Sequence, residues 1–176
     1  IVGVVAGEPA AVVREGLPLV RDLYQVQVSS PFDLMIVSPG GHPKDINLYQ
    51  SQKGLAHAAL VVRDGGTIVL AAACPEGTGS RSYEDWMAGL TSYAAVFERF
   101  EREGFRVGPH KAFQIARDAA RSQVFLVSQM PPDVVRRLLL MPADSLDEAI
   151  ALALDSLPPK ARVGLMPWAN ATIPML

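Results

Sequence analysis

Three polar side chains of different chemistry, Tyr49, Gln50 and Lys53, are spaced so that one helical face would carry all of them. Residues three and four positions apart are surface neighbours on an α-helix. A phenol, a carboxamide and an ammonium group side by side favour an anionic, oxygen-rich ligand, and the free N–H groups of a helix start attract anions as well. From the spacing alone, the alternative is a solvated helix face with an ordinary tyrosine against a sheet.

The elements around this face are those of an α/β ligand site. The apolar run Leu34–Val37 predicts a buried strand, and a helical pattern follows from Ile46 to Val62, with Asp45 as the expected N-cap. Between strand and helix, Gly40 and Gly41 permit backbone angles closed to other residues and let a ligand approach the main chain. A strand, a glycine turn and a helix start in this order are where α/β proteins place ligands.

A second glycine-rich loop follows the next predicted strand. The run Thr67–Ala73 comes after a turn at Arg63–Gly66 and is continuously apolar, as in a strand covered on both faces. The loop Cys74–Ser80 follows it. A right-handed crossover makes the two strands parallel and places their following loops at one sheet edge. We therefore expect both loops to face a single crevice.

The rest of the chain continues the alternation of strands and helices. Further strands are predicted at 1–5, 24–28, 123–128 and 161–166, and helices at 9–20 with a break at Pro18, 83–103 with a break at Gly89 and an end at Gly104, 110–121, 131–140, and 145–157 behind a capping box at Ser145. This order predicts a mostly parallel sheet with helices on both faces, a Rossmann-like or flavodoxin-like three-layer sandwich.

Length and composition set the limits of these expectations. A chain of 176 residues with 49% hydrophobic residues fits one compact domain, residues 1–176. A net charge of −2 without a basic run argues against a nucleic-acid surface, and no apolar stretch approaches the roughly 20 residues that cross a bilayer. We expect a cytoplasmic protein without membrane contact. The chain begins inside an apolar run rather than at Met, so we expect it to have been cut from a longer protein.

Two other chemistries are disfavoured by the residues. His42, His57 and His110 are too scattered to form a metal site by spacing, so no metal is expected in this chain. The Tyr-x-x-x-Lys spacing is similar to that of short-chain dehydrogenases, which need a glycine-rich phosphate turn after the first strand. Here Ala6-Gly7-Glu8-Pro9 stands at that point. The single cysteine, Cys74, reads as a small buried residue at a strand end.

Residues 39–53, Pro-Gly-Gly-His-Pro-Lys-Asp-Ile-Asn-Leu-Tyr-Gln-Ser-Gln-Lys, resemble the C-terminal domain of the nickel-dependent lactate racemase family, and the resemblance continues at 65–70, 74–80 and 110–113. It implies that Tyr49, Gln50 and Lys53 line an active site, with Tyr49 and Lys53 binding substrate. Gln50 is also a candidate cofactor contact, and so are Gly40 and Gly41, because their backbone lets a ligand approach closely. Lys53 would stabilise the substrate carboxylate, with Tyr49 and Gln50 orienting substrate or cofactor.

The same resemblance implies the activity. The full-length protein would be a racemase or epimerase that removes hydride from the α-carbon of a small 2-hydroxy acid and returns it to the opposite face. By this resemblance, residues 1–176 would be the C-terminal domain of a longer two-domain protein. Its nickel pincer nucleotide would be held mainly by an N-terminal domain whose motifs are absent here, so the isolated domain is expected to be inactive. The alternative is a non-catalytic α/β module that binds an organic anion or a partner domain. The sequence leaves open the roles of His42, Lys111, Phe113, Trp168 and Asn170.

Overall fold

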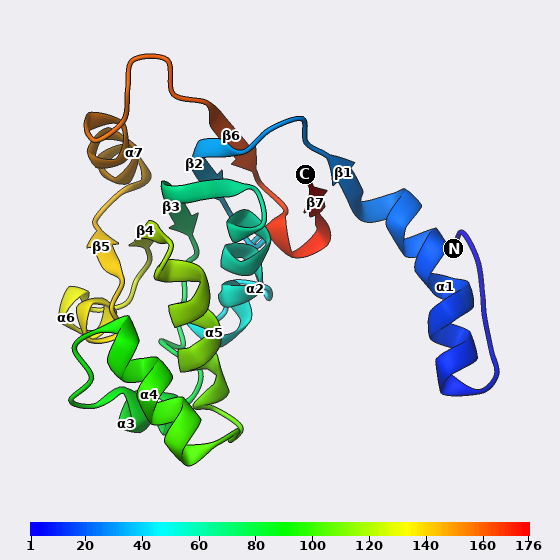
Figure 1. Ribbon diagram of the computed structural model, residues 1–176, viewed down its shortest axis with the longest axis horizontal. Coiled ribbons are helices and arrows are strands. Elements are labelled where there is room, and N and C mark those ends of the chain that lie inside the picture. The colour runs from blue at the N-terminus through cyan, green and yellow to red at the C-terminus, as the bar shows by residue number, and fades with distance from the viewer.

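A five-stranded parallel sheet forms the centre of the molecule, with the strand order β5-β4-β3-β2-β6 (Figure 1). This computed structural model describes residues 1–176. The elements in chain order are α1 (Pro9–Tyr24), β1 (Gln25–Gln27), β2 (Phe32–Val37), α2 (Leu48–Ala59), β3 (Val62–Ala71), α3 (Arg81–Met87), α4 (Tyr93–Glu103), α5 (His110–Ala119), β4 (Ser122–Val127), α6 (Pro132–Arg137), β5 (Met141–Ala143), α7 (Leu146–Asp155), β6 (Val163–Met166), the short 3-10 helix η1 (Ala169–Ala171) and β7 (Ile173–Met175).

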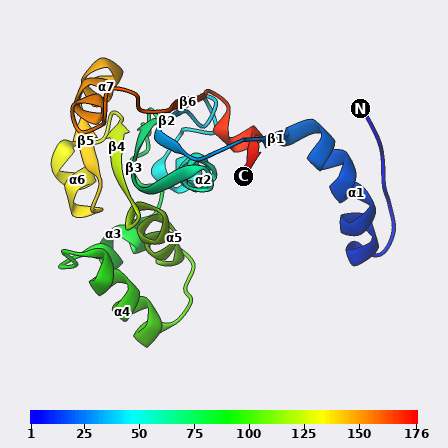
Figure 2. The same cartoon turned by 45° about the horizontal axis from the view of Figure 1, so that its top comes forward.

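Helices cover both faces of this sheet, as Figure 2 shows with α7 on one side and α2 and α5 on the other. Alternate strand residues enter two different cores. Met35 and Ile68 belong to a large cluster shared with α2 and α5, whereas Leu34 and Val69 pack in a smaller cluster with Ala149 of α7. Burial on both faces explains why β2 and the second half of β3 are apolar runs rather than alternating patterns. The predicted three-layer α/β class is confirmed.

Strands β3, β4 and β5 are added in turn on one side of β2, and β6 is added on its other side, so β2 lies at a topological switch point of the sheet. Open α/β sheets commonly bind ligands beside such a switch point, outside the carboxyl ends of the strands. The loops after β2 and β6 meet there, because the amide of Ala169 donates to the carbonyl of Ser38 at 2.8 Å. At the switch point, the first glycine loop is therefore hydrogen-bonded to the C-terminal segment.

The predicted turn at Arg63–Gly66 lies within β3, but its residues do not pair regularly with β2. Val62 pairs with Phe32 while Thr67 pairs with Leu34, so the residues between them bulge out of register. The boundaries predicted for this strand and for α2 were therefore displaced, because the helix ends at Ala59 and β3 begins at Val62.

The N-terminal segment differs most from expectation. Residues 1–5 form no strand and are exposed, because they have no sheet partner and lie along α1 instead, where Val5 approaches Gly16. Helix α1 continues through Pro18 without the predicted break and buries none of its residues. It projects away from the sheet in Figure 1. The short strand β1 pairs with β7 in a separate two-stranded sheet.

Most remaining elements were predicted at shifted boundaries. The region 83–103 is split into α3 and α4 around Gly89, and Gly104 ends α4 with a φ of 73°, both as predicted. Strands β5 and β7 were missed because each has only three residues, too few for a periodic pattern. No helix has the length and apolar character needed to cross a membrane.

Candidate functional site

The helix that carries the predicted site residues starts two residues later than expected. Asn47, not Asp45, is the N-cap of α2, and its Oδ1 accepts from the amide of Gln50 at 3.1 Å. Asp45 is occupied by the neighbouring loop instead, because its Oδ2 accepts from the amide of Ala73 at 3.3 Å and its carbonyl from Cys74 at 2.8 Å. Asp45 therefore joins the two glycine loops rather than beginning the helix.

The two glycine-rich loops meet at the same sheet edge, as predicted, and bond directly to each other. The amides of Leu48 and Tyr49 donate to the carbonyls of Gly77 and Thr78 at 2.9 and 3.0 Å. Gly79 has a φ of 71°, and a Cβ there would collide with the side chain of Asn47. The N–H groups at the start of α2 are thus already satisfied, which removes the helix start as an anion site.

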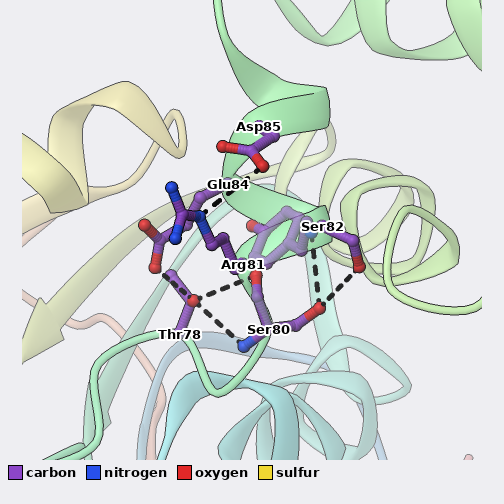
Figure 3. A network of polar contacts seen from close by, with 7 residues as sticks. Thr78, Ser80, Arg81, Ser82, Glu84 and Asp85 are labelled. Carbon is purple, nitrogen blue, oxygen red and sulfur yellow. Dashed lines mark hydrogen bonds and ion pairs between the residues drawn. The ribbon is translucent and has the colours of Figure 1, made fainter.

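A network of polar contacts fixes the second loop against α3, as Figure 3 shows. Thr78 Oγ1 donates to Glu84 Oε1 at 2.5 Å and accepts from the amide of Ser80 at 3.2 Å. Ser80 in turn caps α3, since its Oγ accepts from the amide of Tyr83 at 3.3 Å. Because Thr78 also bonds to the Tyr49 amide, α3 fixes the loop that holds the first turn of α2.

The side chains on the outer flank of α2 are grouped as their spacing predicts. Lys53 Nζ donates to Gln50 Oε1 at 2.7 Å, and Lys53 is exposed. Gln50 and Tyr49 are half-buried, and the Tyr49 hydroxyl makes no hydrogen bond within the chain. This flank therefore presents a phenol, an amide and an ammonium group to solvent or to another domain, and the catalytic and binding roles of the three residues stay predictions.

Helix α5 adds a second ammonium group, which the sequence reasoning had left undecided. Lys111 is 7% exposed; its Nζ donates to Gln52 Oε1 at 3.0 Å and lies 4.6 Å from the centroid of the Tyr49 ring. Burial, and then the nearby charge of Lys53, lower the pKa of Lys111 below its usual value. One available signal was its helical spacing from buried Ile115, which places Lys111 on the inward face of α5.

No acidic side chain neutralises either ammonium group. Lys53 and Lys111 both lack an ion pair, although Arg and Asp or Glu side chains form pairs elsewhere on the molecule, as at Arg63 and Asp33. The edge of the Tyr49 ring meets His110, with the ring centroids 5.8 Å apart. The flank of α2 with the start of α5 is therefore a positively charged patch with hydrogen-bond donors and an aromatic floor, suited to an organic anion.

Gly40 and Gly41 adopt the left-handed backbone expected of glycine, with φ of 106° and 72°. Gly40 faces the segment after β6, because a Cβ there would lie 3.1 Å from Cδ1 of Trp168 and 3.6 Å from Nζ of Lys44, whereas a Cβ on Gly41 would meet no neighbour. Trp168 itself is 64% exposed. A role for the two glycines in holding a cofactor stays a prediction.

The other undecided residues have different places. Phe113 packs with Phe97 and Phe100 in an aromatic cluster and does not face the flank of α2. His42 is exposed, and Asn170 has a buried Oδ1 without a partner. His57 donates from Nδ1 to the carbonyl of Ala169 at 2.5 Å, which fixes its ring against η1.

The residues present fit an organic group better than a metal ion. No three His, Cys, Asp or Glu side chains gather into a possible metal site. The Tyr49 hydroxyl and the Gln50 amide nitrogen are free to bond an organic cofactor or a substrate, and the Cys74 thiol is excluded because it is buried beside Ser51. Burial raises the pKa of Cys74 to about 11, with the charge of Asp45 adding to the rise and the bond to Ser51 opposing it.

Comparisons with known proteins agree on one family. Residues 26–173 match the family described as the lactate racemase C-terminal domain. The chain is 27% identical over 171 residues to a lactate racemase of Thermoanaerobacterium thermosaccharolyticum and 28% identical over 171 residues to one of Lactiplantibacillus plantarum. Each alignment covers 95% of this chain and 40% of the relative.

Solved structures give the same result. The lactate racemase apoprotein of Thermoanaerobacterium thermosaccharolyticum superposes with a TM-score of 0.87 at 26% identity, over 93% of this chain and 40% of that one. A protein of Thermotoga maritima has a TM-score of 0.57 at 12% identity, which is a likeness of fold alone. The chain spans 40% of the length of the lactate racemases it matches. It belongs to the lactate racemase C-terminal domain family.

Proposed function

We propose that the full-length protein is a racemase or epimerase of small 2-hydroxy acids, and that the outer flank of α2 is the wall of its active site that binds the substrate carboxylate. The observation that carries this proposal is the pairing of Lys53 with Gln50 on an open face with no acidic partner. Both matched relatives are named lactate racemases, which supports a lactate-type 2-hydroxy acid as the substrate.

The three residues divide the binding of a 2-hydroxy acid between them. The ammonium group of Lys53 binds the carboxylate through a charge-assisted hydrogen bond. The amide nitrogen of Gln50 is free to donate, because its oxygen already accepts from Lys53. The Tyr49 hydroxyl bonds the substrate hydroxyl or the edge of the cofactor. Since Thr78 and Lys111 hold Tyr49 in place, these donors are positioned before the substrate arrives.

Inversion at the α-carbon requires that the intermediate stays bound while it changes its orientation. The 2-oxo acid that forms when the hydride leaves the α-carbon and the hydroxyl proton passes to a base of the N-terminal domain keeps its carboxylate charge. Lys53 can therefore hold the acid from one end through both halves of the reaction, while the rest of the molecule turns. A nickel pincer nucleotide supplies the hydride acceptor when bound. Tyr49 and Gln50 would contact it from this side, and an N-terminal domain of the same protein would hold it and complete the site.

The direct test is to give the full-length, cofactor-loaded protein a panel of D- and L-2-hydroxy acids. We expect loss of optical activity for at least one acid, with the 176-residue chain alone showing none. If no acid loses optical activity, the proposal is wrong. Binding of an organic anion by a protein that racemises nothing would favour the non-catalytic binding module.

A further inference from the structure

We propose that Lys111 is a positioning residue for the anion site: its ammonium group, held between the Gln52 amide and the Tyr49 ring, fixes the phenol and adds a second positive charge behind Lys53. The inference rests on the proposed function, because it assigns to that site a preference for carboxylate substrates to which two lysines contribute.

The contacts of Lys111 leave its charge directed toward the flank of α2. Its Nζ has one hydrogen-bond acceptor, Gln52 Oε1 at 3.0 Å, and otherwise faces the π-electrons of Tyr49 at 4.6 Å. Gln52 is 4% exposed and Lys111 is 7% exposed, so neither group is freely solvated. A buried ammonium group without an acidic partner is costly, and structures keep such groups mainly at functional sites.

The charge of Lys111 reaches the substrate through low-dielectric surroundings. Tyr49 and Lys53 from α2 and His110 beside it on α5 are the titratable groups around it. The positive charges of Lys53 and Lys111 repel each other. An anion bound at the flank of α2 would reduce that repulsion. Lys111 would therefore strengthen carboxylate binding without touching the substrate, by holding Tyr49 in place and by its charge.

The kinetic test uses the full-length, cofactor-loaded protein with Lys111→Met, which keeps most of the unbranched side chain and removes the charge. We expect KM for lactate to rise about tenfold while kcat changes less than about twofold, because the charge acts on bound substrate and transition state alike. Lys160→Met is the matched control, since Lys160 is exposed and makes no ion pair. It should leave both constants unchanged.

An unchanged KM in Lys111→Met, or a fall in kcat alone, would overturn the inference. If racemisation is observed and depends on Lys53 but not on Lys111, only this inference fails. If no hydroxy acid is racemised, the proposed function fails first.

A measurement on the full-length, cofactor-loaded protein with Lys111 intact covers the case in which Lys111→Met does not fold. The pKa of Lys111 is followed by lysine-selective NMR with and without L-lactate. We expect lactate to raise this pKa, because a bound carboxylate supplies the opposite charge, while the signal of Lys160 stays where it is. A Lys111 signal that titrates identically with and without lactate would contradict the proposal.

Discussion

The backbone of the first turn of α2 and the side chains on the outer flank of this helix are close in space but differ in how far their hydrogen-bonding groups are satisfied. At the first turn, the amides of Leu48 and Tyr49 are bonded to the second glycine loop and the Gln50 amide to Asn47. On the flank, Lys53 has only the neutral Gln50 amide as its partner. The glycine-rich sequence around the first turn resembles an anion-binding loop, yet its backbone donors are already satisfied, and the anion site that we propose is made of side chains.

This difference gives the two regions separate tasks. The junction of the loops 38–47 and 72–80 holds α2 rigidly, because its backbone groups bond to each other and to α3 through Thr78. The flank then presents donors whose positions are already fixed. Changes at the junction should therefore lower stability, and changes on the flank should lower activity.

The largest effect is expected for Lys53→Ala in the full-length, cofactor-loaded protein. Loss of the charged donor should reduce kcat/KM by about a hundredfold or more, as when a preorganised donor is removed from an active site. Because Lys53 is exposed, the free energy of unfolding should change by less than about 0.5 kcal/mol. Racemisation assays and urea denaturation measure the two quantities. An unchanged rate would remove Lys53 from the site.

The sealed junction should protect Cys74. The thiolate is the reactive form, and burial raises the pKa of Cys74 to about 11, so alkylation at pH 8 should be at least about a hundredfold slower than in the unfolded chain. The folded state holds this proton more tightly than the unfolded one, so the contribution to stability is present below about pH 9 and is lost as the pH rises toward 11. Rapid labelling at pH 8 in the folded chain would mean that the junction opens.

A pair of glycine substitutions separates backbone strain from loop packing. Gly79 and Gly89 have similar φ values of 71° and 80°, but only a Cβ on Gly79 meets a neighbour, the side chain of Asn47. Gly79→Ala should therefore lower the free energy of unfolding by about 1–2 kcal/mol more than Gly89→Ala, because it also displaces the N-cap. Urea denaturation of both variants gives the difference. Equal losses would show that the two loops do not depend on this contact.

The smallest effect is expected for Asn47→Ala. Removing the N-cap bond to Gln50 should lower the free energy of unfolding by about 1 kcal/mol. If junction and flank are separate, KM for lactate should change less than about threefold in the full-length protein. A large loss of activity without loss of stability would mean that the first turn itself contacts the substrate.

Sequence patterns predicted the structure best where the pattern depends on a single strand or helix. The runs Leu34–Val37 and Thr67–Ala73 predicted strands because both faces of the sheet are covered, although β3 ends at Ala71. The spacing of Tyr49, Gln50 and Lys53 predicted their common flank. The apolar run at 1–5 misled, because apolar residues predict a strand only when a sheet edge is available to pair with them.

Contacts between segments far apart in the sequence could not be predicted from such patterns. Lys111 reaches Tyr49 because α5 packs beside α2, and the carbonyls of Gly77 and Thr78 bond the start of α2 because two crossovers start at the same sheet edge. Neither fact is local to a stretch of sequence. The N-cap was misassigned for the same reason, since Asp45 bonds the following loop instead of its own helix.

The most direct measurement compares lactate with lactamide, its neutral amide, in the full-length, cofactor-loaded protein and in Lys53→Met. If Lys53 binds the carboxylate, the preference of kcat/KM for lactate over lactamide should fall by at least about tenfold in the variant, because the loss is specific to the charged substrate. The same preference in both proteins would contradict the assignment of this flank as the carboxylate site.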